Sequence, residues 1–384
     1  MRILFCGLSG IPNKASASIN RYMAIGQALS LNNEVIFVNR FPLYKESEQQ
    51  SVETNTSFKI IDATNIKYRP QSFFKRNFIK YVSFIFEYQT IKKINKEQKI
   101  DWFNVYTQFF GLLLFYCFLS KIFSFKTILH YVEFRSMFKK RTWLFRINDF
   151  LFDKFAVFLC DKIIPISTTL NRHILTLKRT AHTLIIPPIC DFKYFDSIKP
   201  EVSDRKYFVF CASTSYEEVF LFIIKSFLKI NKSSEITLHL VINGDITNQT
   251  IKQLLEANKE IIFVFSKLEY KKLIAKYKGS VAQLIPLRNS IQDCARFPQK
   301  ICEFLASNRP IITTGFGEIN HYFMDNINAI VATDYEINSY SKKMEWVLNN
   351  PNKLQTIANN SYIFGLNHFD TYSYSSKIEL FLSA

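Results

Sequence analysis

Short apolar runs alternate with longer stretches of helical periodicity along most of the chain. Residues 2–7 and 34–39 are apolar runs of strand length. Between them, residues 17–31 carry apolar side chains at helical spacing, with Ser16 in the N-cap position. The order strand, helix, strand predicts a βαβ unit and therefore a parallel sheet. Further strands are predicted at 58–62, 102–106, 127–132, 162–166 and 183–189.

The pattern starts again after the prolines at 187 and 188, which predict a hinge between two domains. In the second half, strands are expected at 207–212, 236–242, 261–265, 282–286, 310–314 and 329–332, and helices at 217–230, 337–349 and 353–364. We therefore predict an α/β protein with two doubly wound parallel-sheet (Rossmann-like) domains facing a cleft, formed by residues 1–190 and 191–364. Ligands of such folds bind outside the carboxyl ends of the strands.

Composition and charge narrow the class of protein. A chain of 384 residues with 48% hydrophobic and 21% charged residues is a globular protein and not a disordered one. The formal net charge is +17, and it is uneven. Residues 1–195 hold 28 Lys and Arg against 13 Asp and Glu, whereas residues 196–384 hold 21 against 19. The first half is therefore expected to face an anion: nucleic acid, a phosphorylated ligand or an anionic membrane.

The cysteines, histidines and apolar runs exclude several kinds of site and segment. The 7 cysteines are scattered without a Cys-x-x-Cys pair, which favours reduced thiols in a cytoplasmic protein. The 6 histidines show no metal-binding spacing. The N-terminus does not resemble a signal peptide. The longest apolar run, 109–119, is shorter than the ~20 residues that span a bilayer.

The most informative segment is a short helix predicted over 298–307. Pro298 suits its first turn, and Asn308 suits the left-handed position that ends it. Because this helix lies between two strands that are predicted to be buried, its Glu303 needs a partner. One interpretation is a ribose, whose two hydroxyls a carboxylate accepts together. The alternative is a surface ion pair with Lys300.

Two glycine-containing loops follow predicted strands. The strand ending at Thr314 runs into Gly315-Phe316-Gly317 before a predicted helix, where backbone N–H groups can bind a phosphate. A plain turn is the alternative. The loop over 6–12 lacks the full Gly-x-Gly-x-x-Gly motif, which argues against a Rossmann dinucleotide site.

A longer stretch joins the helix predicted over 298–307 to the loop at 315–317 and reads Arg296-Phe297-Pro298-x-Lys300-x-x-Glu303-x-Leu305-Ala306-x-x-Arg309-Pro310-Ile311-Ile312-x-Thr314-x-Phe316-Gly317-Glu318-Ile319. It resembles the donor-domain signature of family 4 retaining glycosyltransferases of the GT-B fold. Four other segments are similar to the family in the same order: 160–167, 186–195, 242–244 and 284–287. The resemblance therefore covers nearly the whole chain. It implies a GT-B-like fold, a nucleotide-sugar donor, and neither a metal nor another cofactor.

The resemblance also implies roles for individual residues. Glu303 is expected to bind the donor ribose, and Lys300 and Arg296 to offset phosphate charge. The diphosphate and the sugar are expected to lie beside Gly315, Phe316, Gly317 and Glu318. The loop around Ser9 and Gly10 is expected to face the donor from the first domain. Residues 365–384 are expected to form a C-terminal helix that packs back on that domain.

The chain departs from the family pattern at two places. The family often has a glutamate eight residues before the ribose-binding one, and Ala295 stands there. Many members carry a lysine after the first donor-domain strand, where this chain has Ser213-Thr214-Ser215-Tyr216-Glu217-Glu218. These departures leave open a relative that has lost the donor chemistry.

His130 and Glu133 lie at the carboxyl end of the strand predicted at 127–132. Either side chain is a candidate catalytic residue that hydrogen-bonds the acceptor or the transferred sugar. The alternative for His130 is a hydrogen bond to the backbone. Retaining enzymes of this fold show no clear protein nucleophile, so none is assigned.

Basic and aromatic residues interleave in two segments, 67–99 and 138–146. The first holds nine Lys and Arg against two Glu, together with Phe73, Phe74, Phe78, Phe84 and Phe86. This composition suits an anionic membrane surface. The alternative is a core of phenylalanines beneath a solvated lysine face. No recognised nucleic-acid motif is present, so nucleic acid is not expected as a partner.

Taken together, the sequence predicts a hexosyltransferase that uses a nucleotide-sugar donor and a glycan or lipid-linked acceptor. Its expected setting is bacterial cell-surface synthesis of lipopolysaccharide, capsule or glycolipid, in the cytoplasm and peripheral at the inner face of the cell membrane. Two alternatives stay open. One is a nucleotide-sugar epimerase of similar fold, and the other is a non-catalytic relative that binds membrane or glycan.

Overall fold

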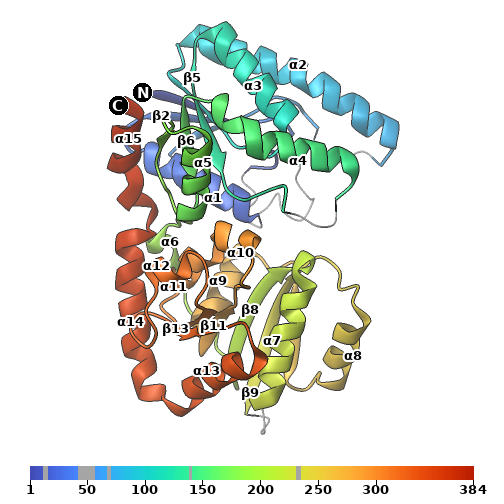
Figure 1. Cartoon of the computed structure of the whole chain (residues 1–384), viewed down its shortest axis with the longest axis vertical. Coiled ribbons are helices and arrows are strands. Elements are labelled where there is room, and N and C mark those ends of the chain that lie inside the picture. The colour runs from blue at the N-terminus through green and yellow to red at the C-terminus, as the bar shows by residue number, and fades with distance from the viewer. Residues whose placement is uncertain (12–15, 42–56, 67–70, 138–140, 231–234) are drawn as a thin grey trace. The chain divides into compact units, whose positions relative to one another are not determined.

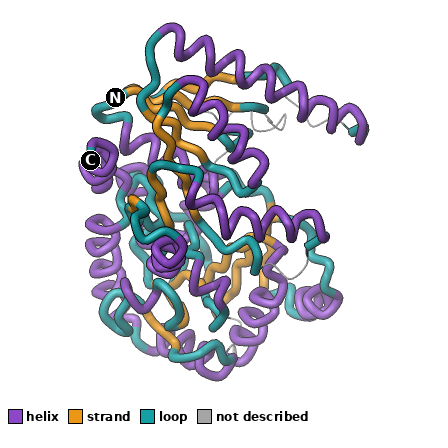
Figure 2. The backbone as a smooth tube through the Cα atoms, turned by 45° about the horizontal axis from the view of Figure 1, so that its top comes forward, coloured by secondary structure: helices purple, strands orange, loops and turns teal. Residues whose placement is uncertain are grey.

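The computed structural model of the chain describes residues 1–11, 16–41, 57–66, 71–137, 141–230 and 235–384. These residues form two compact units. Unit 1 consists of Met1–Ile189 together with Thr371–Ala384, and unit 2 consists of Cys190–Asp370. Each unit has its own parallel sheet, and Figure 2 shows the strands of both sheets in orange among purple helices.

The sheet of unit 1 has seven parallel strands in the order β3-β2-β1-β4-β5-β6-β7. Their bounds are β1 Arg2–Cys6, β2 Glu34–Asn39, β3 Lys59–Asp62, β4 Trp102–Val105, β5 Lys126–Tyr131, β6 Lys162–Pro165 and β7 His182–Thr183. All five residues of β1 are buried, as expected of a central strand that is covered on both faces. The apolar runs predicted the first six of these strands to within about a residue.

Helices cover the sheet of unit 1. They are α1 Ala17–Leu29, α2 Phe73–Glu97, α3 Phe110–Phe123, α4 Trp143–Phe155, α5 Thr168–Leu177 and α15 Ser375–Ser383, with a short 3₁₀ turn η4 at Thr371–Tyr374. In Figure 1, α15 lies beside α1. Hydrogen bonds also join this C-terminal segment to α1 and to the turn after it: Gln27 Nε2 of α1 donates to the Tyr372 hydroxyl of η4 at 2.6 Å, and Asn33 Nδ2 donates to Glu379 of α15 at 2.7 Å.

The strand predicted at 183–189 is shorter than expected. Regular pairing covers only His182–Thr183, although the amides of Leu184 and Ile186 still donate to β6, at 3.1 Å each. Pro187 and Pro188 follow. Because proline has no N–H group, the ladder ends there.

The sheet of unit 2 has six parallel strands in the order β10-β9-β8-β11-β12-β13. Their bounds are β8 Lys206–Ser213, β9 Ile236–Asn243, β10 Ile262–Ser266, β11 Ala282–Ile285, β12 Ile311–Thr314 and β13 Ile330–Ala332. The helices are α6 Phe192–Asp196, α7 Glu217–Ile230, α8 Gln249–Ala257, α9 Tyr270–Gly279, α10 Ile291–Ala295, α11 Lys300–Ala306, α12 Ile319–Tyr322, α13 Ile337–Asn349 and α14 Pro351–His368. One large apolar cluster packs α7 and α13 against β8 and β9.

Two helices of unit 2 have other bounds than predicted. Helix α11 begins at Lys300, and Asn308 has φ 52°, which confirms the left-handed end. Helix α14 continues to His368, so residues 365–368 are the last turn of a unit 2 helix and not part of a separate C-terminal helix. Only the residues from Thr371 onward belong to unit 1.

Among the helices in the described ranges, none combines the length and the apolar character that crossing a bilayer requires.

Candidate functional site

Three loops of unit 2 meet at one edge of its sheet, because β8, β11 and β12 are parallel neighbours whose carboxyl ends lie side by side. Thr314 connects the carboxyl ends of β11 and β12 by hydrogen bonds. Its hydroxyl donates to the carbonyl of Leu287 at 2.5 Å and accepts from the amide of Leu287 at 2.8 Å. Gly317 has φ 58°, and a Cβ there would lie 2.7 Å from Cys294 Cα. The Gly-x-Gly loop therefore rests directly on α10.

Glu303 lies beneath this edge, on α11, and is only 5% exposed. The Tyr270 hydroxyl donates a hydrogen bond to its Oε1 at 3.1 Å. Burial raises the pKa of Tyr270 well above its usual value, and the negative charge of Glu303 raises it further. A surface ion pair with Lys300 is not the setting of this carboxylate, because every residue from Ile301 to Ala306 is buried.

Lys300 and Arg296, the two predicted phosphate-binding cations, differ in their surroundings. Lys300 is half-buried at the start of α11 and forms no ion pair with any described residue. Its charge acts on the Cys211 thiol of β8, whose pKa burial raises and Lys300 lowers. Arg296 is paired with Asp293 at 3.0 Å and stacks over the Tyr216 ring at 4.4 Å. Lys300 is thus the more available cation of the two.

The predicted phosphate loop has a mixed outcome. Gly315 and Phe316 are half-buried, and the Gly315 amide is bonded to the carbonyl of Ala332 at 3.0 Å. Glu318 is 1% exposed. Burial, with the negative charge of Glu318 as a smaller contribution, raises the pKa of Tyr322 to about 12. The helix that follows has only four residues, Ile319–Tyr322. The helix dipole expected to assist phosphate binding is therefore small, since it grows with the number of aligned peptides.

Asp293 and Arg288 were not among the predicted site residues. Asp293 is fully buried on α10 and accepts hydrogen bonds from Arg288 Nε at 2.8 Å and Arg288 Nη2 at 3.1 Å. The sequence pattern Ser290-x-x-Asp293 is typical of a helix cap, and Ser290 does cap α10. The capping pattern explains Asp293 as a residue of the first helical turn, but it does not indicate that Asp293 also pairs with two arginines.

In unit 1, Ser9 and Gly10 follow the carboxyl end of β1. Gly10 has φ 78°, and its amide donates to the carbonyl of Phe41 at 2.9 Å. Gly7, at the end of the strand, has φ 105°, and a Cβ there would lie 2.3 Å from the carbonyl oxygen of Tyr106. This loop therefore passes close to the end of β4.

His130 lies deeper than expected. We predicted a strand-end side chain facing a ligand, but His130 is 1% exposed. Its Nε2 is 2.5 Å from Asn104 Oδ1, and its ring stacks on Tyr106 with centroids 5.5 Å apart. Burial, with the charge of Arg21, lowers the pKa of His130 well below its usual value, so the ring is neutral at pH 7. Its Nδ1 has no hydrogen-bond partner among the residues that the structure describes.

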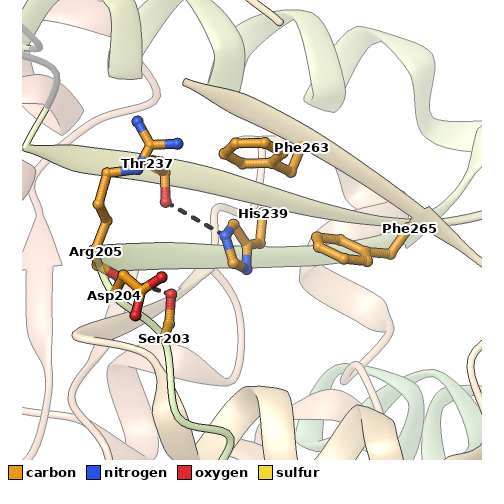
Figure 3. A pocket seen from close by; sticks show the side chains of 7 residues that line it. All are labelled: Ser203, Asp204, Arg205, Thr237, His239, Phe263 and Phe265. Atoms are coloured by element: carbon orange, nitrogen blue, oxygen red, sulfur yellow. Dashed lines mark hydrogen bonds between the residues drawn. The ribbon is translucent and has the colours of Figure 1, made fainter. Parts of the chain in front are cut away.

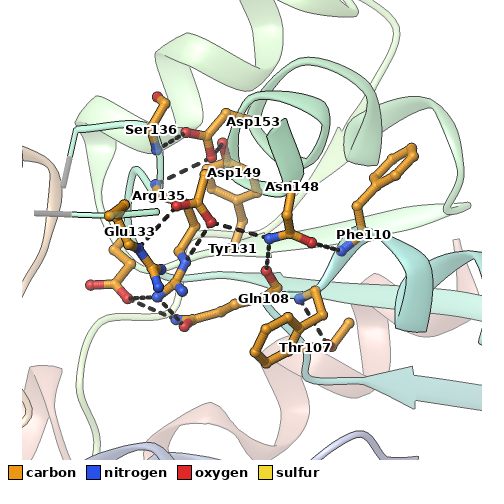
Figure 4. Close-up of polar contacts among 12 residues, drawn as sticks. Thr107, Gln108, Phe110, Tyr131, Glu133, Arg135, Ser136, Asn148, Asp149 and Asp153 are labelled. Carbon is orange, nitrogen blue, oxygen red and sulfur yellow. Dashed lines mark hydrogen bonds and ion pairs between the residues drawn. The ribbon is translucent and has the colours of Figure 1, made fainter. Parts of the chain in front are cut away.

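Glu133 belongs to a polar network at the carboxyl edge of unit 1 (Figure 4). Its Oε1 accepts from Gln108 Nε2 at 2.9 Å and pairs with Arg135 at 3.1 Å. Arg135 also pairs with the buried Asp149 of α4, at 3.5 Å. Glu133 is thereby held between the loops that follow β4 and β5, a position that suits contact with a ligand at this edge.

The predicted site residues thus fall into two groups. Unit 1 holds Ser9, Gly10, His130 and Glu133, and unit 2 holds Arg296, Lys300, Glu303, Gly315, Phe316, Gly317 and Glu318. Figure 3 shows a pocket in unit 2 that contains none of them. It is lined by Ser203, Asp204, Arg205, Thr237, His239, Phe263 and Phe265, near the amino ends of β8 and β9. Within the described part of the chain, no cluster of His, Cys, Asp and Glu suits a metal ion.

Comparison with known proteins agrees with this architecture. Residues 192–364, a little under half of the chain, match the family model of glycosyl transferases group 1. A search among curated proteins returned no match. Residues 192–364 cover most of unit 2 and contain every predicted donor-site residue of that unit.

Solved structures similar to the whole chain share the GT-B fold. Sucrose-phosphate synthase from Thermosynechococcus elongatus has a TM-score of 0.77 at 13% identity, with 100% of each chain covered. HepE of Anabaena, solved with UDP-glucose, has a TM-score of 0.70 at 14% identity, with 100% of this chain and 99% of that chain covered. WaaG, a glycosyltransferase involved in lipopolysaccharide biosynthesis, has a TM-score of 0.65 at 12% identity, with 100% of each chain covered. This chain therefore has the GT-B fold, with two parallel-sheet α/β domains.

Proposed function

We propose that this protein is a glycosyltransferase that moves a sugar from a nucleotide-sugar donor to a glycan or lipid-linked acceptor, with retention of configuration. The observation that carries the proposal is Glu303. A buried carboxylate on a short helix, inside the segment that matches the glycosyl transferase family, suits the two hydroxyls of a ribose. Lys300, three residues earlier, supplies a cation for the phosphates.

We assign the contacts to the donor's diphosphate to the same edge of the unit 2 sheet. A nucleoside diphosphate leaving group develops negative charge as the glycosidic bond breaks, and fixed cations and backbone N–H groups stabilise that charge. We assign the stabilisation of this charge to Lys300 and to the loop of Gly315, Phe316 and Gly317. In unit 1, Glu133 is assigned to the acceptor or the transferred sugar, whereas the buried His130 contacts Asn104.

The test is a thermal-shift panel of UDP, GDP, ADP and CMP and their sugars. The variant is Glu303→Gln, which keeps the volume of the side chain but replaces one acceptor oxygen with a donor. A ligand at 100 times its dissociation constant stabilises the folded state by ~2.7 kcal/mol, which is readable as a melting shift. The matched control is Glu256→Gln, an exposed glutamate on α8.

The expected result is one nucleotide that stabilises the wild type and the control but not Glu303→Gln. A panel in which no nucleotide shifts the wild type would contradict the proposal. It would favour the non-catalytic relative that Ala295 suggests. Slow hydrolysis of a donor sugar by the wild type would exclude that alternative.

We further propose that the acceptor is reached at an anionic membrane, at the cytoplasmic face of the cell membrane. Helix α4 carries the argument, because its apolar and acidic positions are inverted. Trp143, Leu144 and Phe150 are 68%, 61% and 53% exposed, whereas Asp149 and Asp153 are buried. Large apolar side chains that are exposed together on one helix mark a surface that contacts lipid or protein.

The positive charge beside these apolar residues favours an anionic lipid surface as the partner. Exposed cations accompany the apolar residues on two helices, Lys75 and Lys80 on α2 and Arg146 and Lys154 on α4. Both acids of α4 are buried. Of the five phenylalanines singled out in the sequence, Phe73, Phe74, Phe78 and Phe86 are exposed, and only Phe84 is half-buried. Residues 67–70 and 138–140 of the two predicted segments lie outside the described residues.

A further inference from the structure

Asp293 joins two arginines at the edge of unit 2. Arg288 reaches both of its oxygens, Nε to Oδ2 at 2.8 Å and Nη2 to Oδ1 at 3.1 Å, and Arg296 Nη2 reaches Oδ1 at 3.0 Å. Burial alone would raise the pKa of Asp293, but the hydrogen bonds from Arg288 and the charge of Arg296 hold it below its usual value. The group therefore contains two positive charges and one negative charge, all held in fixed positions.

The excess positive charge is not fully used within the protein. Arg296 Nε is buried and has no hydrogen-bond partner among the described residues. Within the described ranges, the other ion-pair partner of Arg288 is Glu218, at 3.2 Å, and the side chain of Glu218 is 85% exposed. An exposed ion pair of this kind is weak, so a more highly charged anion can displace the carboxylate. Both arginines thus have hydrogen-bonding capacity for an oxyanion.

The arginine pair lies beside the predicted phosphate loop. Gly317 packs on the backbone of Cys294, the residue that follows Asp293. Leu287, the residue before Arg288, is hydrogen-bonded to Thr314 at the end of β12. Arg296 in turn stacks over Tyr216, in the loop after β8 where the family's lysine is missing. The cations therefore stand at the same sheet edge as the position that lacks one.

We propose that Arg288 and Arg296, held in place by Asp293, bind the diphosphate of the donor, so that the loop between β11 and α11 supplies the positive charge that the loop after β8 lacks. This inference rests on the proposed glycosyltransferase function. Guanidinium groups suit the task because they donate two parallel hydrogen bonds to a phosphate and keep their charge. Asp293 acts as a positioning residue, since it is buried behind both arginines.

The test compares nucleoside diphosphates with their monophosphates by isothermal titration calorimetry on the full chain. The pairs are UDP with UMP, GDP with GMP and ADP with AMP, and the variants are Arg288→Gln and Asp293→Asn. The matched control is Lys259→Gln, which removes an exposed cation far along the sequence from this group. Melting temperatures without ligand check that each variant folds.

We expect Arg288→Gln to lower the diphosphate affinity about tenfold, the equivalent of ~1.4 kcal/mol, and to lower the monophosphate affinity less. Asp293→Asn gives the sharper contrast. It removes a negative charge beside a polyanion, so charge alone predicts tighter binding, whereas loss of positioning predicts weaker binding. We expect weaker binding. Because Arg288 is partly exposed, its variant decides the question if Asp293→Asn does not fold.

The outcomes separate the two proposals. Wild-type protein that binds none of the three diphosphates refutes the proposed function, and this inference with it. Wild-type protein that binds a diphosphate, with an unchanged ratio of diphosphate to monophosphate affinity in Arg288→Gln, refutes only the inference. Tighter diphosphate binding by Asp293→Asn overturns the positioning role of Asp293.

Discussion

Replacement of Trp143 by serine is expected to weaken binding to anionic vesicles by a large and calculable factor. The side chain is 68% exposed on α4. Full burial of a large apolar side chain contributes roughly 3 kcal/mol, so insertion of the exposed two thirds contributes ~2 kcal/mol. The partition coefficient should therefore fall about thirtyfold, since each 1.4 kcal/mol is a factor of about ten.

The assay is flotation with phosphatidylcholine vesicles, with and without phosphatidylglycerol. Wild-type protein should float with the anionic vesicles, and less so as salt is added, because exposed charges are screened. The control is Ile363→Ser, which removes an apolar residue that is 58% exposed on α14 of unit 2. It should float like the wild type.

The melting temperature separates membrane binding from folding. Because Trp143 is largely exposed, its replacement leaves the folded core intact and should leave the melting temperature within a few degrees of the wild type. Equal flotation of Trp143→Ser and the wild type would refute the role of α4. Equal loss in Ile363→Ser would show that the binding is unspecific, and wild-type binding to uncharged vesicles at the same level would refute the electrostatic part.

Two further predictions concern stability. Gly317→Ala should lower the free energy of unfolding by at least ~1 kcal/mol, because its backbone is left-handed and its Cβ would meet Cys294 Cα at 2.7 Å; urea unfolding of the variant measures this, and an unchanged midpoint would contradict it. Burial, together with the charges of Lys276 and Arg205, lowers the pKa of His239 from 6.5 to about 3. The unfolded chain therefore binds more protons below pH 6.5, and this histidine costs ~2 kcal/mol of stability between pH 7 and pH 5. His239→Gln should remove that part of the pH dependence in urea unfolding at the two pH values, and an unaltered pH dependence would show that other groups cause it.

The fold followed from the sequence because buried parallel strands are continuous apolar runs. Residues 207–212 are apolar at every position, and the structure confirms this strand as β8. The segment at 183–189 misled for a physical reason. Its side chains are apolar, but pairing depends on N–H groups, and two successive prolines supply none.

The candidate site was only partly predictable. The sequence indicated that Glu303 is a carboxylate in a buried helix, and the structure confirms its burial. Its partner Tyr270 comes from another helix, 33 residues away, and no local pattern points to it. The pairing of Arg296 with Asp293 was within reach, since residues three apart on a helix face each other. The convergence of Arg288 on the same carboxylate depends on how the loop folds back, which spacing does not encode.

Helix α4 shows why apolar periodicity does not determine which face of a helix is buried. Apolar residues occur all around it, and what fixes its orientation is the burial of two acids. Asp153 accepts from the Tyr131 hydroxyl at 2.9 Å and from the Ser136 amide at 2.8 Å, and Asp149 pairs with Arg141 at 3.1 Å.

Turning these acids outward would leave the largely buried Arg135 and Arg141 without this counter-charge, at a cost of several kcal/mol. The helix therefore keeps the acids inside and its aromatic residues outside. Tyr131 is the last residue of β5, and the other partners belong to the segment that follows it and that also carries Glu133. Arg135 bridges Glu133 and Asp149 in this network. The contacts that expose the apolar face of α4 therefore also fix the position of Glu133, the carboxylate that we assign to the acceptor side of the reaction.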